Sequence, residues 1–188
     1  MYQNSNSPLV QPILESIQRS QLPLKLDTLT EGDGNCFSRA VVSQCQRESV
    51  KEVVETPIKS YMMLKKNVAS FMKTSRHPVV KAYKREYQKV LQPVTKESWE
   101  QYWLRMQQDT EWADAVYVQG TAWYLMHDIH IMPTTATAEA PFITFSGNRE
   151  RRDLPCPGAA LLLGYTGLHY QSLLETSEER IHMPNFKP

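Results

Sequence analysis

The spacing of apolar residues changes near residue 128, and this change limits the folds available to the chain. Before it, apolar residues recur every three or four positions, which is typical of amphipathic helices. After it, they fall in short runs separated by proline, glycine and polar residues, which is typical of strands. The sequence therefore predicts an α+β domain in which helices pack on a small, mainly antiparallel sheet. The helices are expected from Pro12, from Cys36, from residue 57 to about 74, and within 79–91, 96–108 and 111–128; the strands are expected within 129–132, 142–145, 159–165 and 168–174.

Local signals add detail to this prediction. Thr56 is expected to cap the long helix, with Pro57 in its first turn. Residues 26–34 read as a loop, and residues 165–167 are short enough to connect the last two strands as a hairpin. In the segment 111–128 we expect one apolar stripe to face the core, formed by Trp112, Ala115, Val116, Ala122, Trp123 and Met126.

Length and composition indicate one globular domain. The chain has 188 residues, of which 41% are hydrophobic and 22% charged, and its formal net charge is +1. This balance gives no support to broad binding of nucleic acid or of a membrane surface, although it leaves a local charged patch open. No apolar run approaches membrane-spanning length, and residues 1–12 lack the charged and apolar regions of a signal peptide.

The three cysteines are Cys36, Cys45 and Cys156. They are scattered and form no CxxC pair, so they predict neither a disulfide framework nor a zinc site. A reducing compartment, the cytoplasm or the nucleus, fits this usage best.

The segment 31–42, EGDGNCFSRAVV, places Cys36 between a glycine-rich loop and a helical run. A cysteine attacks a carbonyl carbon as thiolate, and the unpaired N–H groups at a helix N-terminus favour that anion. Gly32 and Gly34 can take positive φ angles, which lets the loop fold tightly, and the same loop can direct N–H groups at an oxyanion. The alternative is a capped turn before a buried structural cysteine.

Of the five histidines, His169 is the best candidate for a base, because it follows a glycine-containing hairpin and opens an apolar strand. His77 is expected in an exposed turn and His182 in a tail that contains proline. His127 and His130 form an HxxH pair, but the change from helix to strand separates them and no acidic or cysteine cluster supports a metal. Each histidine could also have no role in catalysis or metal binding and be simply a solvated or packed side chain.

The block GDGNCFSRAV, followed far downstream by GYTGLHYQSLL, resembles the two signature blocks of the ovarian tumour (OTU) family of cysteine proteases, which are deubiquitinases. The intervening DTEWADAVYVQGTAWYLMHDIHIM is similar to the family's middle block, and SWEQYWLRMQQDTEW is most like its viral branch. The resemblance covers residues 26–174 and implies an OTU-like, papain-like cysteine protease domain. It divides the chain into an N-terminal arm or accessory helix (1–25), a catalytic domain (26–175) and a C-terminal tail (176–188).

Carried over by position, the resemblance implies Cys36 as nucleophile, His169 as general base and Asp33 as the residue whose backbone helps to form the oxyanion hole. Many OTU enzymes have Asn or Asp two residues after the histidine, where this chain has Gln171. Strand alternation places Gln171 on the same side as His169, and its oxygen can accept an N–H bond. Three alternatives stay open: Gln171 orients His169, another residue does so, or His169 acts without a third member. Gln171 itself is equally readable as an exposed strand residue.

The implied activity is hydrolysis of isopeptide bonds after the C-terminal glycine of ubiquitin, with no metal and no cofactor. The expected partner is ubiquitin or polyubiquitin, or a ubiquitin-like modifier, and neither nucleic acid nor membrane; the expected location is the cytoplasm or nucleus, of a host cell if the protein is viral. A catalytically weak ubiquitin-binding module and a viral-type protease that also cuts a polyprotein are the alternatives.

Gly167, Phe37 and Tyr170 are candidate walls of a narrow channel for the ubiquitin tail, and Tyr170 is equally suited to the core. The segment 51–91 is either a ubiquitin platform or a set of solvated helix faces.

Overall fold

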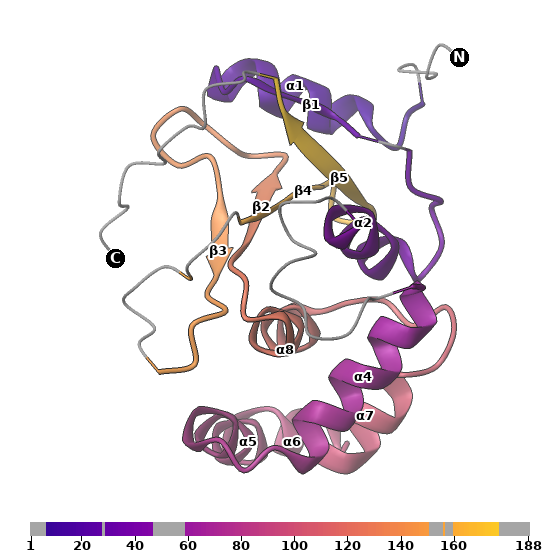
Figure 1. Ribbon diagram of the computed structural model, residues 1–188, viewed down its shortest axis with the longest axis vertical. Helices are drawn as coiled ribbons and strands as arrows, with labels where there is room; N and C mark the ends of the chain where they lie inside the picture. Colours follow the sequence, from indigo (N-terminus) through magenta and orange to yellow (C-terminus); the bar gives the residue numbers. More distant parts are fainter. Residues whose placement is uncertain (1–6, 28, 47–58, 151–155, 157–159, 177–188) are drawn as a thin grey trace.

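The computed structural model describes residues 7–27, 29–46, 59–150, 156 and 160–176. It contains a five-stranded sheet in the order β1-β5-β4-β2-β3, shown in Figure 1. The strands are β1 (Leu24–Leu26), β2 (Ile129–Pro133), β3 (Ile143–Phe145), β4 (Leu161–Tyr165) and β5 (Tyr170–Glu175). The β2–β4 pair is parallel and the other three pairs are antiparallel, so the predicted mainly antiparallel sheet is confirmed.

The helices precede all but one of these strands, as the change in apolar spacing predicted. They are α1 (Gln11–Ser20), α2 (Cys36–Cys45), α4 (Tyr61–Thr74), α5 (Pro78–Val90), α6 (Gln92–Thr95), α7 (Trp99–Met106) and α8 (Ala115–Leu125). β1 was not predicted: its three residues lie within and just before the expected loop, and they pair with β5 from Leu24↔Glu175 to Leu26↔Leu173. This pairing brings residues from near the start of the chain to its last strand.

The sheet is covered by α1 on one face and by α2 and α8 on the other (Figure 1). Ile13 of α1 belongs to a small apolar cluster with Leu162 of β4 and Leu173 of β5. A Cβ atom at Gly164 would lie 2.5 Å from Ile13 Cγ2, so glycine allows α1 to pack closely over β4. Leu161 and Leu163, which point to the other face, join the main core with α2 and α8.

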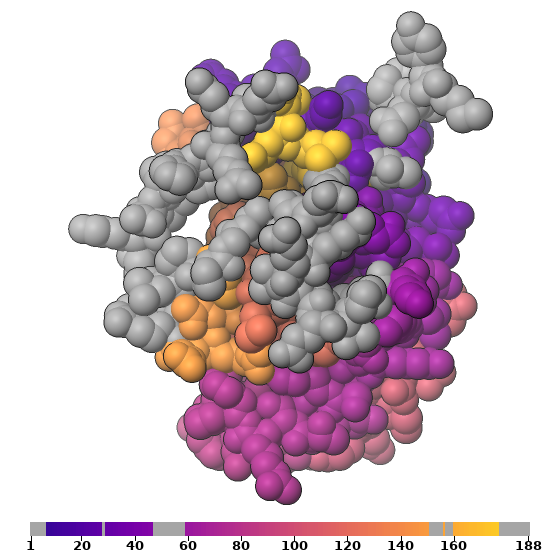
Figure 2. Space-filling view, viewed as in Figure 1, coloured from indigo at the N-terminus to yellow at the C-terminus, as the bar shows by residue number. Residues whose placement is uncertain are grey.

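The helices α4 to α7 form a lobe beside the sheet, which is the magenta end of the molecule in Figure 2. Its interior is aromatic: Trp99 and Trp103 of α7 are fully buried, and Tyr87 of α5 packs edge-on against Trp99. α7 begins with a capping box in which the Ser98 and Gln101 side chains each accept a hydrogen bond from the other residue's backbone N–H. Within the described ranges, no helix combines the length and the apolar character needed to span a bilayer.

Two local predictions differ from the structure. The long helix begins at Tyr61, where the Ser60 hydroxyl accepts a hydrogen bond from Met63 N; the predicted cap, Thr56 with Pro57, lies outside the described residues. The apolar stripe of segment 111–128 is wrong at Trp112 and Met126, which are 50% and 40% exposed, and at Ala115, which is also exposed. α8 ends at Leu125 and is buried on almost every side, so no single stripe defines its packing.

Candidate active site

Cys36 is the first residue of α2, so its side chain lies at the N-terminus of that helix as predicted. The Tyr170 backbone N–H donates a hydrogen bond to Cys36 Sγ at 3.4 Å. The glycine-rich loop and the last strand are 134 residues apart in sequence, and the fold joins them at this sulfur. Cys36 is only 1% exposed, so the sulfur is covered in this conformation.

His169 immediately precedes β5 and is also 1% exposed. A Cβ atom at Gly32 would lie 4.0 Å from His169 Nδ1, so the imidazole lies against the loop that precedes Cys36. Among the described residues, neither ring nitrogen has a partner at hydrogen-bond distance and angle. The structure therefore brings Cys36, its loop and His169 together, with no hydrogen bond formed between the thiol and the imidazole.

Burial drives both groups toward their uncharged forms. The pKa of Cys36 is raised by burial and by the charge of Asp33, while the backbone N–H groups of Tyr170 and Phe37 act in the opposite direction. The pKa of His169 is lowered by burial, and the Gln171 side chain and the Asp33 carboxylate partly oppose this. In this conformation both shifts favour the thiol and the neutral imidazole.

Gln171 is fully buried, so the reading of it as an exposed strand residue is wrong. Its Oε1 accepts a hydrogen bond from Thr30 N at 3.0 Å, and its Nε2 donates to Ser172 O at 3.3 Å. The Gln171 amide also acts to raise the pKa of His169, although its geometry falls short of a full hydrogen bond to the ring. Gln171 thus connects the loop before Cys36 to the strand that follows His169.

Asp33 holds the loop through its carboxylate. Asp33 Oδ1 accepts from Asn35 N at 3.0 Å, and Asp33 Oδ2 accepts from Asn35 Nδ2 at 3.1 Å and from Arg39 at 3.0 Å. Burial acts to raise the pKa of Asp33, but the hydrogen bonds from Arg39 and Asn35 outweigh it and the pKa is lowered. The Cys36 N–H donates to the Asp33 carbonyl at 3.1 Å, so the loop closes on itself in a tight turn.

The loop glycines are required for a reason that differs from the predicted one. Neither Gly32 nor Gly34 has a positive φ angle; among the described glycines only Gly167 does, at 92°. A Cβ atom at Gly34 would lie 1.6 Å from the Thr110 carbonyl oxygen. Glycine is needed at position 34 because a distant backbone segment passes directly against it.

The sequence did not indicate that Lys65 belongs to this site. Asn35 is 1% exposed and accepts a hydrogen bond from Lys65 Nζ at 3.0 Å. One sequence signal was available, because Lys65 occupies the apolar face of α4, one turn from Ala69 and two from Met72. A lysine on such a face either reaches the surface or meets a buried acceptor.

The remaining histidines lie away from Cys36. His77 caps α5 by accepting a hydrogen bond from Val79 N, His127 bonds Leu125 O through Nδ1, and His130 bonds Thr144 Oγ1 through Nδ1. His182 is outside the described residues. Across the described residues, histidine, cysteine and acidic side chains nowhere gather in groups of three or more that suit a metal ion.

The candidate channel residues divide into two kinds. Phe37 and Tyr170 are buried and pack edge-on at 5.1 Å between ring centroids, so in this conformation both belong to the core. Gly167 lies in the hairpin with nothing within 4 Å of a Cβ position, and its neighbour Leu168 is 73% exposed. Of the candidate channel residues, the exposed one near His169 is therefore Gly167, in the hairpin between β4 and β5.

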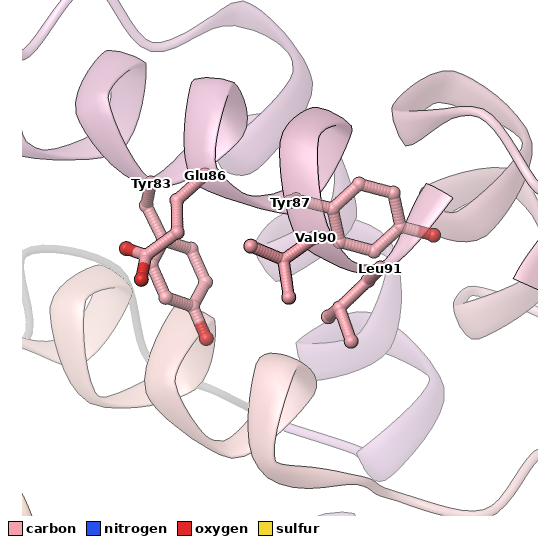
Figure 3. A pocket seen from close by; sticks show the side chains of 5 residues that line it. All are labelled: Tyr83, Glu86, Tyr87, Val90 and Leu91. Atoms are coloured by element: carbon pink, nitrogen blue, oxygen red, sulfur yellow. The ribbon is translucent and has the colours of Figure 1, made fainter. Parts of the chain in front are cut away.

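A separate pocket of about 210 Å³ lies on α5, in the helical lobe (Figure 3). Figure 3 shows the side chains of Tyr83, Glu86, Tyr87, Val90 and Leu91 around it. α5 packs on α6 and α7, away from α2 and β5 (Figure 1). This pocket is not part of the Cys36 site.

Comparisons with known proteins agree on one fold. An OTU domain in complex with ubiquitin superposes with a TM-score of 0.51 at 15% identity, over 80% of this chain and 69% of that chain. The OTUD1 OTU domain gives 0.55 at 16% identity, over 88% and 97%, and the viral OTU domain protease from Taggert virus gives 0.51 at 14% identity, over 84% and 83%. At these identities the likeness shows the fold alone, and both cellular and viral OTU domains share it.

The comparison of the sequence with protein-family models identifies the family of the chain. No curated protein matches the chain. The sequence model described as OTU-like cysteine protease matches residues 31–170, a span that begins in the loop before Cys36 and ends just after His169. This match covers well over half of the 188 residues, and the α+β fold agrees with it. The chain belongs to the OTU-like cysteine protease family.

Proposed function

We propose that this chain is a deubiquitinase that hydrolyses the isopeptide bond after the C-terminal glycine of ubiquitin, with Cys36 as nucleophile and His169 as general base. The observation that carries the proposal is the hydrogen bond from Tyr170 N to Cys36 Sγ at 3.4 Å, because it places the residue after His169 on the sulfur. Family membership supports the reaction class. Ubiquitin is supported as partner by the structural neighbours that are complexes with ubiquitin or ubiquitin aldehyde.

The reaction proceeds in two acyl transfers. Cys36 Sγ, after losing its proton to His169, attacks the carbonyl carbon of the terminal glycine; the C–N bond breaks, and His169 returns the proton to the lysine amine. Water then attacks the thioester carbon while His169 takes its proton, and the sulfur leaves. The negative oxygen formed in each half meets N–H groups of the loop at Asp33 and of the α2 N-terminus. Since the Cys36 N–H bonds the Asp33 carbonyl in the free protein, this loop rearranges when the acyl group binds.

Reaction of the wild-type domain with ubiquitin that carries an electrophile in place of its C-terminal carboxylate tests the proposal. We expect one covalent adduct, and peptide mapping is expected to place it on Cys36. Cys45 and Cys156 are internal controls, because burial raises the pKa of each thiol to about 12 and keeps both protonated. An adduct on another cysteine, or none at all, would contradict the proposal.

Cleavage of all eight ubiquitin linkage types, a ubiquitin-like modifier fusion and a polyprotein junction peptide, with products resolved on a gel, defines the substrate class. A catalytically weak ubiquitin-binding module is the second candidate, favoured by the uncharged thiol–imidazole pair and by Gln171 in place of a carboxylate. It predicts measurable ubiquitin affinity with negligible turnover of every substrate.

We place the action of the protein in the cytoplasm or nucleus, where its free cysteines would stay reduced.

Gln171→Met is expected to lower kcat about 10-fold and to move the acidic limb of the kcat/KM profile to lower pH. Burial already holds the pKa of His169 below its ordinary value, and Gln171 is one of the groups that raise it. Removing the amide lowers the pKa further, so the imidazole stays neutral to lower pH but is a weaker base. Loss of the acceptor for Thr30 N is also expected to cost about 1–3 kcal/mol of the free energy of unfolding.

The measurement is kcat/KM for a fluorogenic ubiquitin amide between pH 4.5 and 8, together with urea unfolding. Gln88→Met, an exposed position on α5, is the matched control and should change neither. An acidic limb that stays in place or moves to higher pH in Gln171→Met would exclude an action of Gln171 on His169.

A further inference from the structure

Lys65 lies in α4 with its ammonium group inside the protein. The residue is 1% exposed, and Nζ donates hydrogen bonds to Asn35 Oδ1 and to the Glu111 carbonyl, each at 3.0 Å. A buried ammonium is costly unless acceptors and opposite charges surround it. Here one acceptor belongs to the residue immediately before Cys36.

The Asn35 side chain uses its full hydrogen-bonding capacity. Oδ1 accepts from Lys65 Nζ and from Thr110 N at 3.1 Å, while Nδ2 donates to Asp33 Oδ2 at 3.1 Å and to Asp109 Oδ1 at 2.8 Å. Asn35 makes no capping bond to α2 with this side chain. Its amide instead ties the loop to α4 and to the turn that follows α7.

The charges around the sulfur come from several elements. Asp33 lies on the loop, Arg39 on α2, His169 before β5, and Asp109 and Glu111 in the turn after α7. Arg39 pairs with Glu31 and Asp33 at 3.0 Å each, so its charge is already engaged by carboxylates. Lys65 is the buried cation of this set: its pKa is lowered by burial, and the charges of Asp109, Glu111, Asp33 and the Cys36 thiolate only partly oppose this. A positive charge near a thiol favours the thiolate, so the ammonium that holds Asn35 acts in that direction on the adjacent Cys36.

We propose that Lys65 is a positioning residue of the site: its ammonium fixes Asn35, and with it the start of α2, and its positive charge favours the thiolate of Cys36. The proposal deepens the proposed function and rests on Cys36 being the nucleophile. Lys65 does not touch the substrate. It acts by holding the Asn35 side chain and by the electrostatic attraction between its positive charge and the Cys36 thiolate.

Lys65→Met tests both parts, because methionine matches the length of the lysine stem but has neither charge nor donor. Lys66→Met, the next residue on α4 and exposed, is the matched control. The first readout is the rate of iodoacetamide alkylation of Cys36 from pH 5 to 10, assigned by peptide mapping. The second is kcat/KM for a fluorogenic ubiquitin amide. We expect the alkylation midpoint to rise by about 0.5–1 pH unit and kcat/KM to fall about 10-fold or more.

The direction of the midpoint separates this role from a structural one. Burial is the main cause of the raised pKa of Cys36. Simple loosening of the loop would admit water and move the midpoint down, whereas loss of the cation moves it up. A midpoint that falls, or one that matches Lys66→Met, would overturn the proposal. Lys65→Arg, which retains the charge, is expected to return the midpoint to within about 0.3 pH unit of wild type.

If Lys65→Met shows no cooperative unfolding transition, Lys65→Gln, which keeps a donor but no charge, is read by the same two measurements with the same criteria. If wild-type Cys36 is alkylated but ubiquitin amides are not cleaved, the proposed function fails, and the alkylation midpoint alone still decides the role of Lys65.

Discussion

Cys36→Ala is expected to abolish hydrolysis of ubiquitin amides, with kcat at least about 10⁴-fold below wild type. The variant lacks the atom that would form the thioester, and no neighbouring side chain in the described site can replace it. The fold should persist, because alanine is a good helix former and the loss of one buried sulfur costs only about 1–2 kcal/mol. Single-turnover hydrolysis of a fluorogenic ubiquitin amide and urea unfolding measure the two effects.

Cys45→Ala is a closely matched control, since Cys45 is the last residue of the same helix and is 6% exposed. It makes the same change in side-chain volume and should keep kcat within about twofold. The double variant Cys36→Ala/His169→Ala should lose no more activity than Cys36→Ala alone, because groups that act as a unit are not additive. Residual hydrolysis that His169→Ala removes from a Cys36→Ala background would point to a different nucleophile.

Gly34→Ala is expected to lower kcat/KM about 100-fold and the free energy of unfolding by about 1–3 kcal/mol. The new Cβ atom would lie 1.6 Å from the Thr110 carbonyl oxygen, which is shorter than any non-bonded contact. Either the loop or the 107–111 turn must move, and both carry hydrogen bonds to Asn35. The consequence is a displaced Cys36 in a protein that still folds.

Gly32→Ala provides the comparison within the same loop. Its Cβ atom would lie 2.9 Å from the end of the Leu9 side chain, which can rotate away, and 4.0 Å from His169 Nδ1, which is an ordinary contact distance. We expect a loss of kcat/KM of less than about 10-fold. Equal activity in Gly34→Ala and wild type would mean that the contact with Thr110 does not hold the nucleophile.

The elements that depend on local patterns could be predicted from the sequence. Helices α4, α5 and α7 and strands β2 to β5 have clear apolar spacing, and Cys36 falls at a loop–helix boundary that residues 31–42 mark directly. The pairing of Cys36 with His169 was predicted from two motifs, and the fold brings Tyr170, the residue after His169, to the Cys36 sulfur without a thiol–imidazole hydrogen bond. In each case a short segment carried enough information.

The features that escaped prediction depend on partners far away in sequence. β1 is a strand because β5 pairs with it, and the apolar–polar alternation of its three residues is too short to predict a strand alone. Gly34 is required by the backbone of Thr110, and the left-handed conformation in that contact belongs to Thr110, with φ 63°, rather than to either glycine. Likewise, Lys65 was missed because its acceptor, Asn35, lies on another element. The readings of Gln171 stayed open because its donor, Thr30, lies far away in sequence.

The order of the strands sets when the two motifs can meet during synthesis. Cys36 is translated before β5, which contacts its sulfur, also pairs with β1, and is the last of the elements described. At about 5–20 residues per second, the 134 residues between Cys36 and Tyr170 take roughly ten seconds to make. During that interval the nascent chain has the Cys36 thiol without His169, and a product truncated before residue 169 would lack the proposed base.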